Sequence, residues 1–331
     1  MKIISIRNLA AVVRTAARGV ADSFGKVAIL CGLLCILSVS DSYGQNIFGR
    51  HKRGNWIPTP DKPGIRISDY ESFSGTQRDG RHDRVRPDNA PDFNNDIILP
   101  KNVTSHKEQI IKRKSYIVSY NPDTRQPNWS AWHLTAAHAD GPYKRKQLRI
   151  DGNYLEDEPS VKGRQYLNDW QGTSGYDHGH MCPSGDNKWS LEAMRQTFFL
   201  SNMCVQNSAL NQGPWEHLES TCRQWAKKYG DIHIVCGPIY YSKPYKRGGT
   251  RRRLAVPDAF FKVVMRTGAH PQAIGFIYQN VNPAANDKMF SHVVTVDEVE
   301  RIPGLDFFST LPDKVESAIE SHADLRQWKT K

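Results

Sequence analysis

Two histidines separated by a single glycine stand in a polar stretch at residues 176–184, and a cysteine follows them. An imidazole near neutral pH can act as a general base, and Gly179 permits a sharp turn that would point His180 into a cleft. His178, His180 and Cys182 also alternate, which is a spacing that favours a zinc site. A third interpretation is structural, with both imidazoles hydrogen-bonded on a loop.

A stretch rich in amide side chains follows at residues 201–212 and leads into a predicted helix that carries Glu216 and Glu219 in its first turns. Asn211 lies eight residues before Glu219, so the two side chains can approach one another if Asn211 sits at the mouth of this helix. Amide and carboxylate oxygens are hard ligands suited to Mg²⁺. Asparagine and glutamine also cap loops, so a structural role is the alternative.

Strands and helices mix around these residues without the regular alternation of a doubly wound sheet, which predicts an α+β fold. Hydrophobic periodicity and capping residues predict one hairpin, two helices and a set of further strands. The hairpin covers 116–120 and 129–134, the helices cover 191–196 after Ser190 and 215–229 before Gly230, and the strands cover 198–200, 232–235, 260–265, 273–278 and 292–296.

Three segments together resemble the DNA/RNA non-specific endonuclease family of ββα-metal nucleases, which includes secreted bacterial and mitochondrial enzymes. They are Asp-x-Gly-His-Met-x-Pro at 177–183, Leu-Ser-Asn-x-x-x-Gln at 200–206 and Leu-Asn-x-x-x-Trp-x-x-Leu-Glu at 210–219. The similarity covers most of residues 110–310. It implies a ββα-metal (His-Me finger) fold with a central antiparallel sheet flanked by helices.

The resemblance also assigns roles to five side chains. His180 matches the general base, and Asn211 matches the direct protein ligand of Mg²⁺, for which Mn²⁺ can substitute. Glu219 matches the acid that orients metal-bound water, Asn202 matches a polar residue that supports the site, and Asp177 is expected to fix the loop. The implied reaction is hydrolysis of DNA and RNA to 5′-phosphate and 3′-hydroxyl ends, and homodimers occur in the family.

One departure from the family pattern lies beside the expected base. The family usually has arginine where this chain has His178, so that side chain is expected to stabilise phosphate more weakly or in a pH-dependent way. We expect His178, Arg145 and Arg252 to contact substrate, the last two from basic tracts. Two alternatives stay open: a catalytically weak nucleic-acid-binding protein on the same fold, and a zinc protein that uses His178, His180 and Cys182.

Four of the six cysteines lie after residue 44, and if the protein is exported this even number can form two disulfides in any of three connectivities. Because two of them flank the site segments, a bridge between Cys182 and Cys204 would brace the site. The other two are Cys222 and Cys236.

The charge of the chain points to a polyanionic partner. The 331 residues carry 45 Lys+Arg against 34 Asp+Glu, which gives a formal net charge of +11. A surface of this kind attracts nucleic acid or anionic membrane whatever the fold. The hydrophobic content of 38% and charged content of 24% exclude a multi-span membrane protein, a coiled coil and a wholly disordered chain.

The N-terminus is typical of a targeting segment. Basic residues precede an apolar run at 27–39, and Ser42-Tyr43-Gly44 offers small residues for cleavage before Gln45. We expect a signal peptide at 1–44, a flexible polar extension at 45–100 and the nuclease domain at 101–331. The mature protein would then be secreted or periplasmic, with no stable membrane insertion. A mitochondrial presequence is the alternative.

Overall fold

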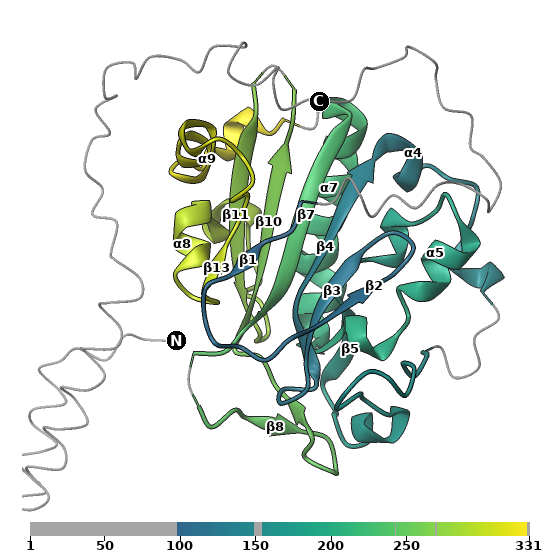
Figure 1. Cartoon of the computed structure of the whole chain (residues 1–331). Helices are drawn as coiled ribbons and strands as arrows, with labels where there is room; N and C mark the ends of the chain where they lie inside the picture. The colour runs from purple at the N-terminus through teal and green to yellow at the C-terminus, as the bar shows by residue number, and fades with distance from the viewer. Residues whose placement is uncertain (1–97, 149–153, 242, 269, 330–331) are drawn as a thin grey trace, which may run out of the picture. The chain divides into compact units, whose positions relative to one another are not determined.

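A seven-stranded antiparallel sheet forms the centre of the computed structural model, which describes residues 98–148, 154–241, 243–268 and 270–329. The expected leader and almost all of the expected extension lie outside these residues. The strand order is β12-β11-β10-β7-β4-β3-β2 (Figure 1). The strands are β2 (Gln109–Lys112), β3 (Ile117–Asn121), β4 (Gln126–Thr135), β7 (Asp231–Ile239), β10 (Ala259–Arg266), β11 (Gln272–Gln279) and β12 (Val293–Val294).

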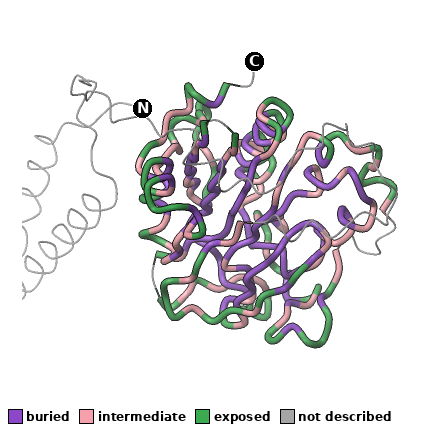
Figure 2. Tube along the Cα trace, turned by 45° about the horizontal axis from the view of Figure 1, so that its top comes forward, coloured by how far each residue is buried: buried purple, intermediate pink, exposed green. Residues whose placement is uncertain are grey.

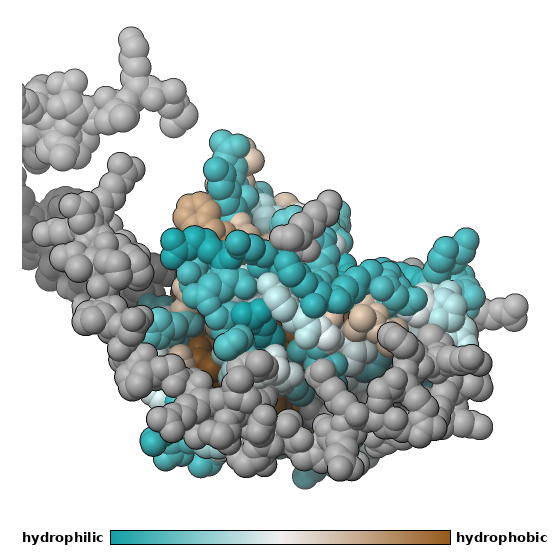
Figure 3. All heavy atoms as spheres, turned by 90° about the horizontal axis from the view of Figure 1, so that it is seen from above, coloured by the Kyte–Doolittle hydropathy of each residue, from teal (hydrophilic) through white to brown (hydrophobic). Residues whose placement is uncertain are grey.

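Both faces of this sheet are covered, so its central strands are apolar at successive positions. Ile234 and Cys236 of β7 belong to the core on one face, together with residues of α7 (Glu216–Tyr229). Val235, between them, belongs to the core on the other face, where α8 (Val296–Glu300) and α9 (Asp313–Glu320) pack. The central strands are accordingly buried along their length (Figure 2), whereas the described residues on the face seen in Figure 3 are mostly hydrophilic.

A separate two-stranded hairpin precedes α7 in the chain. It consists of β5 (Tyr176–His180) and β6 (Met203–Asn207). The chain then passes through α6 (Ser208–Leu210) and a π-helical turn at Asn211–Trp215 before α7 begins. Cys204 of β6 and Leu210 and Trp215 of the following turns pack in the same core cluster as α7 and the sheet face beneath it. The two strands and the helix that follows them form a ββα unit.

The sequence of α7 explains its boundaries and its orientation. Leu218, Cys222 and Trp225 recur at helical spacing and are buried against the sheet. The first turn carries acidic residues and the last turn lysines, which complements the helix dipole. Gly230, with φ of 92°, ends the helix as predicted.

Most predicted elements are confirmed. β3 and β4 form the expected hairpin, and α5 (Leu191–Gln196) is capped by Ser190, whose hydroxyl accepts from Ala193 N at 3.2 Å. The strand expected at 198–200 is wrong, because Phe199 makes a single bridge to Leu155 and the chain then turns into a 3-10 helix at Leu200–Asn202. The strand expected at 292–296 shortens to β12, since Thr295 caps α8.

Short elements complete the described part of the chain: α4 (Ala136–Ala139), the pair β1 (Lys101–Asn102) and β13 (Leu305–Asp306), the pair β8 (Arg247–Gly248) and β9 (Leu254–Ala255), and 3-10 turns at Arg145–Gln147, Leu167–Trp170, Ser184–Asp186, Met289–His292 and Leu325–Gln327. Within the described ranges, no helix has the length and apolar content needed to span a membrane.

The disulfide prediction is wrong in this structure, which holds Cys182, Cys204, Cys222 and Cys236 as free, buried thiols. Two of them have hydrogen-bond partners of their own. The Cys182 thiol lies 3.5 Å from the side-chain amide of Asn187, and the Cys236 thiol donates to the carbonyl of Met181 at 3.0 Å. All four thiols thus lie in the core without a bond between any two of them.

Candidate active site

The β5–β6 hairpin carries both histidines in regular strand geometry. Gly179 lies opposite Cys204, and a Cβ at Gly179 would come within 2.5 Å of the Gln206 Cβ. Glycine is thus required by close packing and not by a sharp turn, so the predicted turn is wrong. Because side chains alternate along a strand, His178 and His180 lie on the same face of the hairpin.

His180 is held as a neutral imidazole. Burial lowers its pKa to about 3, and the nearby Arg145 guanidinium acts in the same direction. Its ring packs edge-on against Phe198, with 4.8 Å between centroids. The buried Nε2 atom has no hydrogen-bond partner among the described residues. A neutral ring with an unpartnered nitrogen has a lone pair that can accept a proton from a reacting water.

His178 is enclosed between two aromatic rings. It stacks on Tyr154 at 3.9 Å and on Trp170 at 3.8 Å, both measured between ring centroids. Burial lowers the pKa of His178 to about 4, so this side chain carries no charge at neutral pH. At the position where the family usually has arginine, the chain therefore presents a fixed neutral ring.

The zinc alternative is wrong on geometric grounds. Cys182 lies beyond the end of β5 with its thiol in the core, while the His178 ring is held in its aromatic stack. Within the described part of the chain, the one group of three His, Cys, Asp or Glu side chains whose ligand atoms converge is Asp297, Glu300 and Glu320, none of which belongs to β5.

Asp177 ties β5 to the turn that bears Asn211. Its carboxylate accepts from Asn211 Nδ2 at 2.9 Å, from Gln212 Nε2 at 2.8 Å and from Ser208 Oγ at 2.7 Å. Burial opposes ionisation of this carboxyl, but the three hydrogen bonds outweigh it and lower the pKa of Asp177. The contact fixes the amide of Asn211 so that its Oδ1 oxygen stays available as a ligand.

Glu219, in the first turns of α7, is half-buried. Burial raises its pKa to about 7, against the opposing effect of the Lys262 ammonium. Lys262 projects from β10 into the same core and lies fully buried near two indole rings, 5.3 Å from the Trp132 centroid and 4.6 Å from the Trp215 centroid. The carboxyl of Glu219 therefore changes protonation in the neutral pH range.

The donor set fits a hard divalent cation. Asn211 Oδ1 and the Glu219 carboxylate are oxygen donors, and no hydrogen bond between described residues uses either of them. Two such donors leave most of the coordination shell to water and substrate, which is how Mg²⁺ is usually held in proteins.

Asn202 supports the site from within the protein and does not face substrate. Its Oδ1 accepts from Ser130 Oγ at 3.1 Å and from Cys182 N at 2.9 Å. Its Nδ2 donates at 2.9 Å to the carbonyls of Cys182 and Thr197. The fully buried amide thus holds the segment that follows His180.

The two predicted arginines have different surroundings. Arg145 is exposed, and its guanidinium lies 4.8 Å from the Phe198 ring centroid. Its positive charge acts to lower the pKa of both His180 and Tyr154. Arg252 lies in the exposed turn between β8 and β9, and none of the described contacts connects it to β5 or to Asn211. The structure therefore groups Arg145, and not Arg252, with the two histidines.

The sequence interpretation missed the aromatic frame of the site and the buried cation beneath Glu219. Tyr154 and Trp170 come from a loop and a short turn without hydrophobic periodicity, so nothing in the pattern marked them, and Phe198 was expected only as part of an apolar strand. Lys262 had a signal, because a lysine in an otherwise apolar strand requires an explanation.

Comparison with known proteins agrees with this geometry. The family model described as DNA/RNA non-specific endonuclease matches residues 93–314. The chain is 34% identical over 213 residues to "Nuclease 1, mitochondrial" of Schizosaccharomyces pombe, a match that spans 60% of this chain and 65% of that protein. It is 32% identical over 230 residues to "Nuclease C1" of Cunninghamella echinulata, with 66% of this chain and 90% of that protein covered.

A chain of the solved EndoG/EndoGI complex is similar in structure, with a TM-score of 0.56 and 25% identity. The match covers 64% of this chain and 90% of that chain. The expected α+β, ββα-metal fold is confirmed by this similarity and by the antiparallel sheet. The chain belongs to the DNA/RNA non-specific endonuclease family.

Proposed function

We propose that this protein is a Mg²⁺-dependent endonuclease that hydrolyses phosphodiester bonds in both DNA and RNA. The observation that carries the proposal is the neutral, unpartnered His180 Nε2 in the same ββα unit as Asn211, whose amide Asp177 orients. Family membership and the basic charge agree with a nucleic-acid substrate.

His180 accepts a proton from water, and the resulting hydroxide oxygen bonds to phosphorus while the bond from phosphorus to the 3′ oxygen breaks. The 3′ oxygen takes a proton from solvent, which leaves 3′-hydroxyl and 5′-phosphate ends. A Mg²⁺ ion held by Asn211 and Glu219 would neutralise charge that develops on the phosphate and the leaving oxygen, and Mn²⁺ would substitute for it.

Arg145 supplies the positive charge that His178 lacks. The guanidinium lies over Phe198, beside the His180 ring, and is exposed to an incoming phosphate. His178 contributes a fixed aromatic surface and not a charge. Contact between Arg252 and substrate stays a prediction.

The proposal is tested with the mature protein on supercoiled plasmid and on RNA, each with Mg²⁺ and with excess chelator. The proposal predicts that both substrates are cleaved with Mg²⁺ and not with chelator. It also predicts that the 5′ ends of the products are labelled by a kinase only after phosphatase treatment, because they carry a phosphate. Tight binding by folded protein without cleavage in Mg²⁺ or Mn²⁺ would favour the nucleic-acid-binding alternative, which the neutral His178 motivates.

We further propose that residues 1–44 are a cleaved targeting leader and that 45–100 link it to the nuclease domain. The S. pombe relative is named a mitochondrial nuclease, which supports the mitochondrial destination, whereas the apolar run at 27–39 favours export. A fluorescent protein fused after residue 60 distinguishes the two, because it would collect either in mitochondria or outside the cytoplasmic membrane. The expected homodimer stays a prediction, which light scattering of the mature chain tests.

A further inference from the structure

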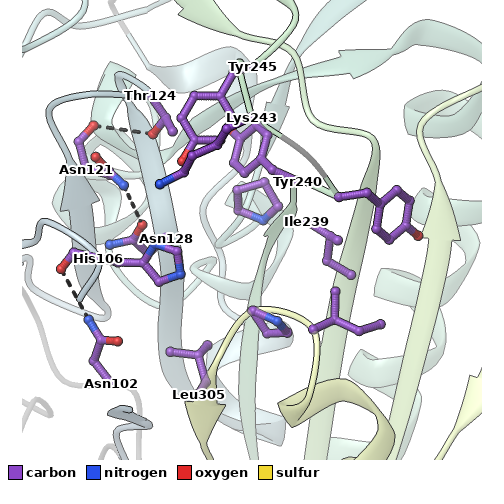
Figure 4. Close-up of a pocket in the computed structure, with 14 residues that line it drawn as sticks. Asn102, His106, Asn121, Thr124, Asn128, Ile239, Tyr240, Lys243, Tyr245 and Leu305 are labelled. Carbon is purple, nitrogen blue, oxygen red and sulfur yellow. Dashed lines mark hydrogen bonds between the residues drawn. The ribbon is translucent and has the colours of Figure 1, made fainter. Parts of the chain in front are cut away.

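A cavity of about 250 Å³ opens at the end of β7, on the side of the sheet covered by α8 and α9 (Figure 4). None of the residues assigned above to catalysis lines it. Its apolar part includes Ile239, at the end of β7, and Leu305 of β13. The cavity therefore combines a sheltered apolar floor with an open, polar side.

Aromatic side chains form one wall. Tyr240 and Tyr245 lie with their ring centroids 4.9 Å apart, and both line the cavity. Aromatic surfaces of this kind bind nucleobases by stacking, without preference for sequence. An apolar floor beside an aromatic wall thus suits a flat heterocycle.

The polar side of the cavity is basic. No aspartate or glutamate is among its lining residues, which include His106 and Lys243. Figure 4 shows the Lys243 side chain extending from the tyrosine wall toward Asn121 and Asn128. These two amides are already hydrogen-bonded, since Asn121 Nδ2 donates to Asn128 Oδ1 at 3.0 Å. Within the described residues, no acid lines the cavity beside the Lys243 ammonium, which lies 5.6 Å from the centroid of the Tyr245 ring and can pair with an anion.

The same loop connects the cavity to the catalytic strand. Lys246, three residues after Lys243, places its Nζ 3.4 Å from the hydroxyl of Tyr176. Tyr176 begins β5, and His180 ends it. The loop that bears Lys243 therefore also contacts the strand that bears His180.

We propose that this cavity binds a nucleoside monophosphate unit, with its base against Tyr240 and Tyr245 and its phosphate at Lys243 and His106. The unit is either a nucleotide of the bound strand or a released mononucleotide, two sources that share the same chemistry. The choice between these sources rests on the proposed nuclease function, but the binding site itself does not.

Binding is measured by calorimetric titration of the mature His180→Ala protein with 2′-deoxyadenosine 5′-monophosphate, in chelator so that no cation contributes. Lys243→Met keeps the aliphatic stem and removes the charge, and we expect it to weaken binding about five- to tenfold. Deoxyadenosine, which lacks the phosphate, should bind with equal affinity to both proteins. Lys314→Met, at an exposed position on α9, is the matched control and should leave binding unchanged. Failure to bind the monophosphate, or equal affinity in Lys243→Met, would overturn the proposal even if the protein is an active nuclease.

Kinetics on otherwise wild-type protein distinguish the two sources. If the strand occupies the cavity, Lys243→Met raises KM for a twelve-nucleotide substrate but not for a dinucleotide, and kcat is unchanged. If a released mononucleotide occupies it, Lys243→Met relieves inhibition by the monophosphate and leaves KM unchanged. Either result supports the site, whereas unchanged KM together with unchanged inhibition argues against it.

Discussion

Asn211 donates a hydrogen bond from its side-chain nitrogen to Asp177 at 2.9 Å, and this contact joins the β5–β6 hairpin to the turn that leads into α7. An amide held through its nitrogen has its oxygen free for a cation. Asp177 is thus a positioning residue that acts through Asn211.

Replacing Asp177 with asparagine should weaken cation use more than substrate use. The variant loses the charge that holds Asn211 Nδ2, so we expect the Mg²⁺ concentration at half-maximal rate to rise about tenfold, a size typical of residues that orient metal ligands. Ser208→Ala, which removes one of the three hydrogen bonds to Asp177, should have a smaller effect in the same direction. Asp140→Asn, at the exposed end of α4, where the carboxylate pairs with Lys227, is the control. An unchanged Mg²⁺ titration in Asp177→Asn would remove this residue from the cation site.

The pH dependence of cleavage should report Glu219. Because its pKa is raised to about 7, the carboxylate form that can hold a cation is lost as pH falls below 7. At low Mg²⁺, kcat/KM should fall about tenfold for each pH unit below 7, which forms the acidic limb of the pH profile. Higher Mg²⁺ should move this acidic limb to lower pH, because the cation favours the carboxylate form. His180, with a pKa of about 3, stays neutral throughout this range.

Glu219→Gln tests that assignment, since glutamine keeps the shape of the side chain and cannot titrate. The variant should be slower and should lack the acidic limb. A limb that persists unchanged in Glu219→Gln would assign the titration to another group.

His178→Arg should raise activity at neutral pH. A planar guanidinium can take the place of the imidazole between Tyr154 and Trp170 and would bring a charge that the neutral histidine lacks. We expect kcat/KM on RNA to increase about three- to tenfold, which corresponds to roughly 1 kcal/mol of added electrostatic stabilisation. His178→Gln is the uncharged comparison, and equal rates for the arginine and glutamine variants would show that charge at this position is unimportant.

Asn202→Leu should destabilise the whole domain. Leucine is similar in size but leaves the amide and carbonyl of Cys182 buried without their partners. The expected loss in the free energy of unfolding is about 3 kcal/mol, measured by urea denaturation. Asn286→Leu, at an exposed position, should change stability by less than about 0.5 kcal/mol. If Asn202→Leu lowers the free energy of unfolding no more than this control does, the hydrogen bonds of Asn202 do not stabilise the segment after His180.

Short-range patterns predicted the main strands and α7, because apolar spacing and the terminal Gly230 act locally. The joint pattern at 177–219 led to the family and to His180, Asn211 and Glu219. The regular strand at Gly179 was not predictable, because the need for glycine comes from contact with Gln206 on another strand. The stack around His178 and the burial of Lys262 likewise depend on residues far away in the sequence.

The role of His180 as the general base is tested most directly by comparing the His180→Ala variant with the wild-type protein. Both proteins are prepared as mature chains that begin at Gln45 and are incubated with plasmid and with RNA in Mg²⁺. Their binding to the same nucleic acids is measured in chelator. We expect the rate to fall at least about a thousandfold, within the range for loss of a general base, while binding affinity changes little. His322→Ala, at an exposed position near the C-terminus, should cleave at the wild-type rate. Cleavage by His180→Ala at the wild-type rate would contradict the account.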